Sequence, residues 1–168
     1  RVPSLVSSSK GTLLAFCAAR KGKGGDWDPI DIVLRRSTNS GKTWSNTQLI
    51  VHREGQPCDN ATPIVDYRNN IIHLVFQISY KNCYYIKSED DGKTWTEPVD
   101  ITYAAIPLRE KYPWVMIAPG PGHGIQLSGG RLLVPVWISD GGGEEAVKSG
   151  KIKHRPSVVS SLFSDDYG

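Results

Sequence analysis

Short runs in which apolar and polar residues alternate follow one another along the chain. A period of two is typical of strands that bury one face, and turn-forming residues separate the runs. No stretch of ten or more residues has a convincing 3.6-residue apolar period, so we predict an all-β chain. The predicted strands are residues 12–18, 30–36, 48–52, 62–66, 71–77, 83–88, 124–127, 131–138 and 158–164.

One turn sequence recurs between these runs. Residues 37–44 (STNSGKTW) and 88–95 (SEDDGKTW) share the pattern Ser-x-Asp/Asn-x-Gly-Lys-Thr-Trp, and residues 164–168 (SDDYG) match the start of a third copy. Ser and Asp side chains accept backbone N–H groups in tight turns, and Gly supplies a positive φ. We expect the Trp to fold back and bury its ring between strands. Asn39 replaces Asp in the first copy, and Asn makes similar turn bonds. The role of this turn is in folding, not in catalysis.

Repeats of several strands about 40–50 residues long point to a β-propeller. Three turn motifs imply about three blades, the third of them unfinished, whereas propellers close with 4–8 blades. We therefore expect residues 1–168 to be the N-terminal part of a longer natural chain, cut within the third turn motif. An open propeller exposes sheet faces and strand edges, so this piece is expected to fold poorly alone.

Composition narrows the class of partner. The chain has 168 residues, of which 39% are hydrophobic and 22% charged, with 17 Gly and 11 Pro. The net charge of +3 is small and the basic residues are scattered, which argues against nucleic acid. No apolar run approaches the roughly 20 residues of a membrane span.

The three cysteines form neither a disulfide framework nor a zinc pattern. Cys17 lies in an apolar run and is expected to be a small buried residue. A bridge between Cys58 and Cys83 stays open, and so does the compartment. A secreted or periplasmic location is favoured, with lysosomal and cytosolic ones as alternatives.

Residues that could act in catalysis or substrate binding lie in four segments. The chain begins Arg1-Val-Pro, and Arg20 ends an apolar strand. A glycine-rich loop then delivers Asp26, with Asp28 as a competitor two residues later. Asp31 alternates with isoleucines and is expected to point away from the core. The fourth segment is residues 120–127 (GPGHGIQL), whose glycines would allow close backbone approach.

Together with the repeated turn, which resembles the Asp box or BNR repeat, these segments resemble the sialidase (neuraminidase) family over all 168 residues. The resemblance implies a six-bladed β-propeller, of which this chain would hold about the first three blades. It also implies an exo-α-sialidase, a glycoside hydrolase that removes terminal sialic acids from glycoproteins, glycolipids or oligosaccharides by a retaining mechanism. No cofactor or metal is expected.

The resemblance also implies roles for particular residues. Arg1 matches the first of three arginines that clamp the substrate carboxylate, and guanidinium forks suit carboxylates. Arg20, 19 residues later, matches an arginine near the C4 side of the sugar. Asp26, 25 residues after Arg1, matches the acid/base catalyst. Asn60 matches a residue near the sugar O4, although Asn-Ala here replaces the usual Asn-Pro. The plainer alternatives are a clipped terminus for Arg1 and a solvated strand end for Arg20.

Three side chains have weaker matches. Trp137 corresponds to an aromatic near the glycerol side chain or is a core residue, and Trp114 lines the acetamido pocket or simply packs. His123 is expected to be structural. The tyrosine nucleophile, its glutamate and two further clamp arginines of the family come later in its sequence, so we expect this piece alone to be inactive.

Two other functions remain open. A non-catalytic Asp-box propeller that binds glycans or proteins explains the repeats equally well, but not the placement of Arg20 and Asp26. A propeller glycosidase acting on neutral sugars would have no carboxylate for Arg1 to bind.

Overall fold

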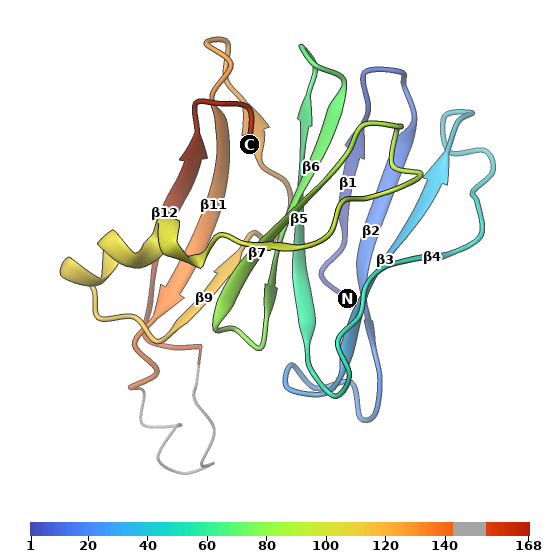
Figure 1. Cartoon of the computed structure of the whole chain (residues 1–168). Coiled ribbons are helices and arrows are strands. Elements are labelled where there is room, and N and C mark those ends of the chain that lie inside the picture. Colours follow the sequence, from blue (N-terminus) through green and yellow to red (C-terminus); the bar gives the residue numbers. More distant parts are fainter. Residues whose placement is uncertain (143–153) are drawn as a thin grey trace.

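Three antiparallel four-stranded sheets stand side by side in the computed structural model, which describes residues 1–142 and 154–168 (Figure 1). The first two sheets are meanders in chain order, each with its strands joined by short turns. Their strands are β1 (Ser4–Ser7), β2 (Leu13–Arg20), β3 (Ile30–Ser37) and β4 (Gln48–Val51), then β5 (Cys58–Asp66), β6 (Ile71–Ile78), β7 (Asn82–Ser88) and β8 (Val99–Asp100).

The third sheet has an interrupted first strand. Both β9 (Met116–Pro119) and β10 (Ile125–Gln126) pair with β11 (Leu132–Ser139), which pairs in turn with β12 (Ser157–Ser164). The glycine-rich segment between β9 and β10 lies against β5, where the Gly124 N–H donates to the Pro63 carbonyl over 2.9 Å. These glycines therefore bring the backbone close to β5.

The all-β prediction is confirmed, and each of the nine predicted strands is present. The structure adds β1, β8, β9 and a 3-10 helix, η1 (Thr102–Glu110), with Pro107 inside it. These elements are two to nine residues long, and their residues show no clear alternation of apolar and polar positions. They form because they pair with or pack against neighbouring elements. Trp114 is buried against η1 and donates its indole N–H to the Ala105 carbonyl over 3.2 Å, so packing is its role.

The core fills the two spaces between neighbouring sheets. Side chains of β2 and β3, including Phe16, pack against β6 and β7, and a second cluster fills the space between the second and third sheets. Because the second sheet is covered on both faces, every residue of β5 is buried. β2 alternates instead, with Phe16 buried and Cys17 half-buried, so the prediction of a buried Cys17 was wrong.

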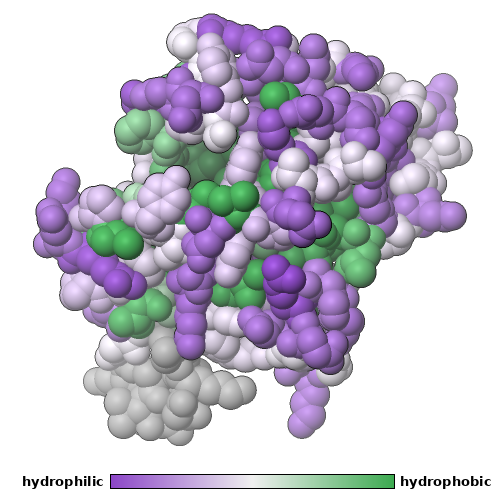
Figure 2. Space-filling model, viewed as in Figure 1, coloured by the Kyte–Doolittle hydropathy of each residue, from purple (hydrophilic) through white to green (hydrophobic). Residues whose placement is uncertain are grey.

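Apolar side chains are exposed on the outward faces of the first and third sheets, notably Leu5, Leu49, Val159 and Phe163. A pocket of about 600 Å³ opens between the second and third sheets, and Ile101 contributes to its lining. Figure 2 shows apolar surface between polar rims over this part of the molecule. In the described chain no helix is long and apolar enough to cross a membrane, and all three cysteines are free thiols.

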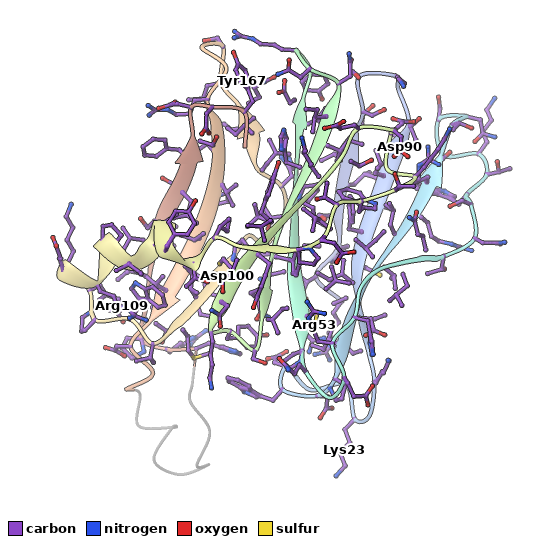
Figure 3. All side chains as sticks on the ribbon, in the orientation of Figure 1. Lys23, Arg53, Asp90, Asp100, Arg109 and Tyr167 are labelled. Carbon is purple, nitrogen blue, oxygen red and sulfur yellow. The ribbon has the colours of Figure 1, made fainter. Side chains whose placement is uncertain are left out.

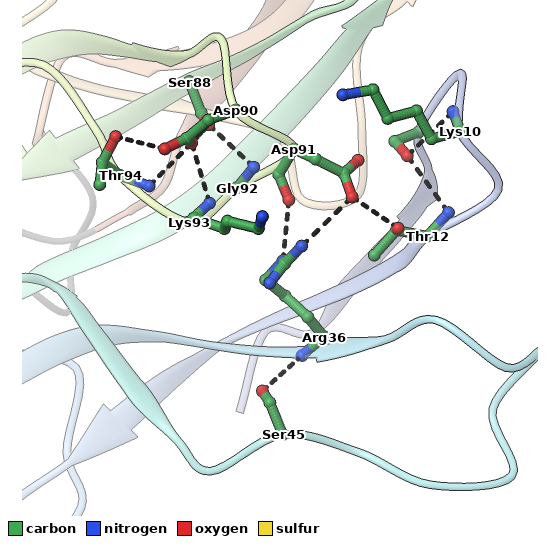
Figure 4. Close-up of polar contacts among 11 residues, drawn as sticks. Lys10, Thr12, Arg36, Ser45, Ser88, Asp90, Asp91, Gly92, Lys93 and Thr94 are labelled. Atoms are coloured by element: carbon green, nitrogen blue, oxygen red, sulfur yellow. Dashed lines mark hydrogen bonds and ion pairs between the residues drawn. The ribbon is translucent and has the colours of Figure 1, made fainter.

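Hydrogen bonds within the second repeated turn, residues 88–95, explain why it needs these residue types (Figure 4). Ser88 Oγ accepts the Gly92 N–H over 2.8 Å, while Asp90 accepts the Thr94 N–H over 2.8 Å and its hydroxyl over 2.6 Å. Slight burial raises the pKa of Asp90, but these hydrogen bonds outweigh it and lower the pKa to about 2. The carboxylate is therefore a structural acceptor in the turn.

The other two copies repeat this geometry. Asn39 accepts the Thr43 N–H over 2.9 Å and donates its amide to the Thr43 hydroxyl over 2.8 Å, so the substitution preserves the turn as predicted. In the third copy Ser164 accepts the Gly168 N–H over 2.8 Å.

The two tryptophans of the repeated turn differ in burial. Trp95 packs edge-on against Phe16 of the first sheet, with ring centroids 5.8 Å apart. Trp44 is 38% exposed, so the expectation of a buried ring was wrong for this copy. Trp95 has a neighbouring sheet to pack against, whereas Trp44 lies over its own turn, 3.9 Å from where a β-carbon on Gly41 would lie.

Asp91 of the second turn also ties the first two sheets together. Its carboxylate accepts the Thr12 hydroxyl over 2.6 Å and pairs with Arg36 over 3.2 Å, and Arg36 Nε donates to its carbonyl over 2.8 Å (Figure 4). Both partners belong to the first sheet or its hairpin, so the turn holds neighbouring blades in register.

Candidate functional site

Arg20 ends β2 at the mouth of the glycine-rich loop, residues 21–29. The loop closes on itself, because the Lys21 N–H donates to the Pro29 carbonyl over 2.9 Å. Gly22 and Gly24 adopt positive φ angles of 61° and 76°, which other residues resist. Arg20 Nη1 donates to the Gly24 carbonyl over 3.1 Å. The strand end and the loop backbone are thus joined by one guanidinium.

Two carboxylates converge on Arg20 from different elements. Nη1 contacts the Asp26 carboxylate in the loop, and Nη2 lies 3.3 Å from Asp59 Oδ2 on β5. The side chains of Arg20 and Asp59 are 9% and 1% exposed, whereas that of Asp26 is 43% exposed. The cluster therefore has a buried end at Asp59 and a solvent-facing end at Asp26.

Burial and the neighbouring charges shift the pKa values of the groups in and beside the cluster. Burial lowers the pKa of Arg20, but the hydrogen bond and charge of Asp26, with the charge of Asp59, raise it above its ordinary value. Burial raises the pKa of Asp59, opposed by the Asn60 N–H and the charge of Arg20. Burial also raises the pKa of Tyr80, and the nearby charges of Asp59 and Asp26 add to that rise.

Asn60 follows Asp59 and is also buried. Its φ is +59°, and its N–H donates to Asp59 Oδ1 over 2.7 Å. The pairing of β5 with β6 shifts register between Asp59 and Thr62, so the strand bulges at this point. The bulge places consecutive polar residues of β5 beside the end of β2.

Arg1 reaches the same region through its backbone. Its carbonyl accepts the Ala18 N–H over 2.9 Å, and its amino group donates to the Ala18 carbonyl over 3.0 Å. The Arg1 side chain is exposed, and its guanidinium forms no ion pair within residues 1–142 and 154–168.

The competing aspartates are engaged elsewhere. Asp28 accepts the Gly25 N–H over 2.8 Å within the loop. Within the described chain Asp31 belongs to none of the apolar core clusters; it pairs with Lys21 over 2.8 Å and His52 over 2.7 Å and is buried beside these side chains. Those hydrogen bonds lower the pKa of Asp31 although burial raises it, and they explain how a carboxylate can lie at a buried strand position.

An aromatic group lies behind the loop. Trp27, next to Asp26, packs on Tyr80 with ring centroids 5.1 Å apart and stacks on His154 at 6.0 Å. Tyr80 also contacts Trp137 at 5.9 Å. Trp137 is thus half-buried in an aromatic cluster, and Trp27 anchors the loop to the turn between β6 and β7.

The cluster of Arg20, Asp26 and Asp59 and the repeated turns lie at opposite ends of the strands. Arg20 ends β2 and Ser37 ends the antiparallel β3, so the two ends point in opposite directions. In Figure 3, Lys23 at the tip of the loop lies far from Asp90 and Tyr167. No group of three or more His, Cys, Asp or Glu residues in the described ranges is placed to hold a metal ion. His123 contacts the neighbouring Gly124 carbonyl and takes no part in the cluster.

The structure thus joins Arg20 directly to Asp26, and places Asn60 and the backbone of Arg1 beside them. Sequence reasoning missed Asp59 and Tyr80. The only signal for Asp59 was a carboxylate beside the selected Asn60, and its pairing with a residue 39 positions earlier is not a local property.

Three curated relatives are similar to this chain in sequence. An exo-alpha-sialidase of Arthroderma benhamiae is 29% identical over 80% of the chain, and a sialidase of Bacteroides fragilis is 31% identical over 83%. Human sialidase-4 is 33% identical over the full chain. The chain spans 40%, 30% and 38% of the lengths of these relatives. The family model described as a BNR repeat-like domain matches residues 11–164.

Solved structures show the same fold. The Hadza microbial sialidase Hz136 superposes with a TM-score of 0.81 at 23% identity, covering all of this chain and 35% of that one. A Trypanosoma rangeli sialidase in complex with the inhibitor DANA superposes with a TM-score of 0.78 at 21% identity, covering all of this chain and 29% of that one. The three sheets are therefore arranged as blades of a sialidase-type propeller.

Proposed function

This chain belongs to the sialidase family of BNR repeat-like proteins, and from that membership we propose that the natural protein carrying it is a retaining exo-α-sialidase. Its substrates would be terminal sialic acids on glycoproteins, glycolipids or oligosaccharides. The observation that supports this most strongly is the direct contact of Arg20 with a solvent-facing Asp26 at the end of β2.

Asp26 is proposed to be the acid/base catalyst. Its carboxyl group protonates the leaving glycosidic oxygen and later takes a proton from the attacking water. Its 43% exposure leaves it accessible to a substrate. Arg20 stabilises the carboxylate that remains after Asp26 has given up its proton. The pair thus supplies both the proton and the compensation for the negative charge.

Arg1 is proposed to bind the substrate carboxylate. Its exposed side chain has no ion pair within the described ranges, so its guanidinium is available to an incoming anion. Arg20, in contrast, is already engaged by two carboxylates and a carbonyl. Asn60 is proposed to contribute to the pocket for the sugar O4 beside them.

A comparison of acidic and neutral substrates tests the proposal. The natural protein should hydrolyse a fluorogenic α-sialoside and leave the corresponding β-galactoside and β-glucoside untouched. Its activity should be inhibited by an unsaturated, carboxylate-bearing sialic acid analogue. Comparable turnover of a neutral hexoside would contradict the proposal in favour of a neutral-sugar glycosidase. Binding of sialosides without turnover would contradict it in favour of a glycan-binding module.

A further inference from the structure

Asp59 is the most deeply buried charge of the cluster. Its side chain is 1% exposed, and it contacts the Asn60 N–H over 2.7 Å and Arg20 Nη2 over 3.3 Å. A buried carboxylate costs stability unless a partner compensates its charge. The guanidinium of Arg20 is that partner, so the two side chains fix each other at a place that substrate does not need to reach.

Arg20 depends on its terminal nitrogens for its orientation. Its Nε is buried and has no hydrogen-bond partner among the described residues. Nη2 binds Asp59 on β5, while Nη1 binds the Gly24 carbonyl and Asp26 in the loop. The guanidinium therefore bridges a strand that is buried along its whole length and a loop whose residues are exposed or half-buried.

We propose that Asp59 is a positioning residue: it fixes the Arg20 guanidinium, and Arg20 in turn holds the glycine-rich loop so that Asp26 faces the substrate. The inference rests on the proposed function for the role of Asp26. The anchoring of the loop stands on the contacts alone, so it can be measured without substrate.

Charged or titratable groups from other elements face Asp26 and Asp59. Arg20 comes from β2 and Tyr80 from the turn after β6, and the two aspartates both face Arg20. Removing the charge of Asp59 leaves Arg20 to compensate Asp26 alone. The electrostatic environment of the acid/base step therefore changes.

Hydrogen exchange of the loop tests the anchoring. In Asp59→Ala, amides of residues 21–29 should exchange about tenfold faster than in the parent protein, because the bridge to β5 is lost. Asp66→Ala is the matched control, since Asp66 is a buried carboxylate at the other end of β5 that binds Asn69 and Gln126. Unchanged exchange in Asp59→Ala, or equal acceleration by both variants, would overturn the proposal.

The pH profile of sialoside hydrolysis tests the link to Asp26. Asp59→Asn preserves the shape and an acceptor oxygen for Arg20, so the protein should fold. The basic limb of kcat/KM should move to lower pH by about one unit. Asp66→Asn should leave the profile in place. A lower kcat in Asp59→Asn with an unmoved profile would show a merely structural role and contradict the inference.

The hydrogen-exchange and pH-profile experiments distinguish a failure of the inference from a failure of the proposed function. If the parent protein hydrolyses no sialoside, the proposed function fails while loop exchange still decides whether Asp59 anchors the loop. If the parent is active and Asp59→Ala leaves exchange unchanged, only the inference fails.

Discussion

Replacing Asp26 by alanine is expected to reduce kcat for a natural sialoside by about 10³-fold, since general acid–base catalysis contributes 10²–10⁴-fold. The leaving group of a natural glycan is a sugar hydroxyl, a poor leaving group that needs a proton as the bond breaks. Asp26 is the solvent-facing carboxylate of the cluster, and Arg20 alone cannot donate that proton efficiently. The measurement is the rate of sialic acid release from a sialylated trisaccharide.

The size of the loss should depend on the leaving group. An activated aryl sialoside leaves without protonation, so the same variant should lose much less activity on that substrate. Asp28→Ala is the matched control, because Asp28 lies in the same loop and its carboxylate accepts the Gly25 N–H. Full activity of Asp26→Ala on the trisaccharide, or an equal loss in Asp28→Ala, would contradict the assignment.

Replacing Gly124 by alanine is expected to destabilise the protein by about 3 kcal/mol, at the upper end of overpacking costs. A β-carbon on Gly124 would lie 2.5 Å from Ile64 Cγ1 and 2.6 Å from the Leu133 carbonyl oxygen. Ile64 lies on β5, whereas the Leu133 carbonyl is backbone of β11, so the glycine-rich segment would have to move away from both. The measurement is the free energy of unfolding from chemical denaturation.

Gly129→Ala provides the control in the same segment of the chain. Gly129 is exposed and has no positive φ, and a β-carbon there would have no neighbouring atom within 4 Å among the described residues. Alanine at this position should be neutral or stabilising by up to about 1 kcal/mol. A loss in Gly124→Ala no greater than that in Gly129→Ala would show that the contact with β5 does not hold the third sheet.

The sequence predicted most of the strands and all three repeated turns because these features are local. A period of two needs only neighbouring residues, and Ser88, Asp90 and Gly92 meet within five positions. Asn39 could be accepted as a substitute for the same reason. By contrast, β1 has only four residues and forms because it pairs with β2. Its own residue pattern was too short to predict it.

The candidate site was only partly predictable. Spacing selected Arg20 and Asp26, six positions apart, but the third member of the cluster comes from another sheet. The burial of Asp31 depends on Lys21 and His52, and the exposure of Trp44 depends on which sheet lies beside it. Such properties belong to long-range pairings, which residue patterns do not contain.

We propose that the guanidinium groups at this end of the strands serve a reaction on an acidic sugar. The most direct test compares kcat/KM of the natural protein for an aryl α-sialoside and for the methyl ester of the same sialoside, in which a neutral ester replaces the carboxylate. We predict that the ester is hydrolysed at least about 100-fold less efficiently, since a charge-assisted contact is lost. Equal efficiency on the two substrates would contradict the account.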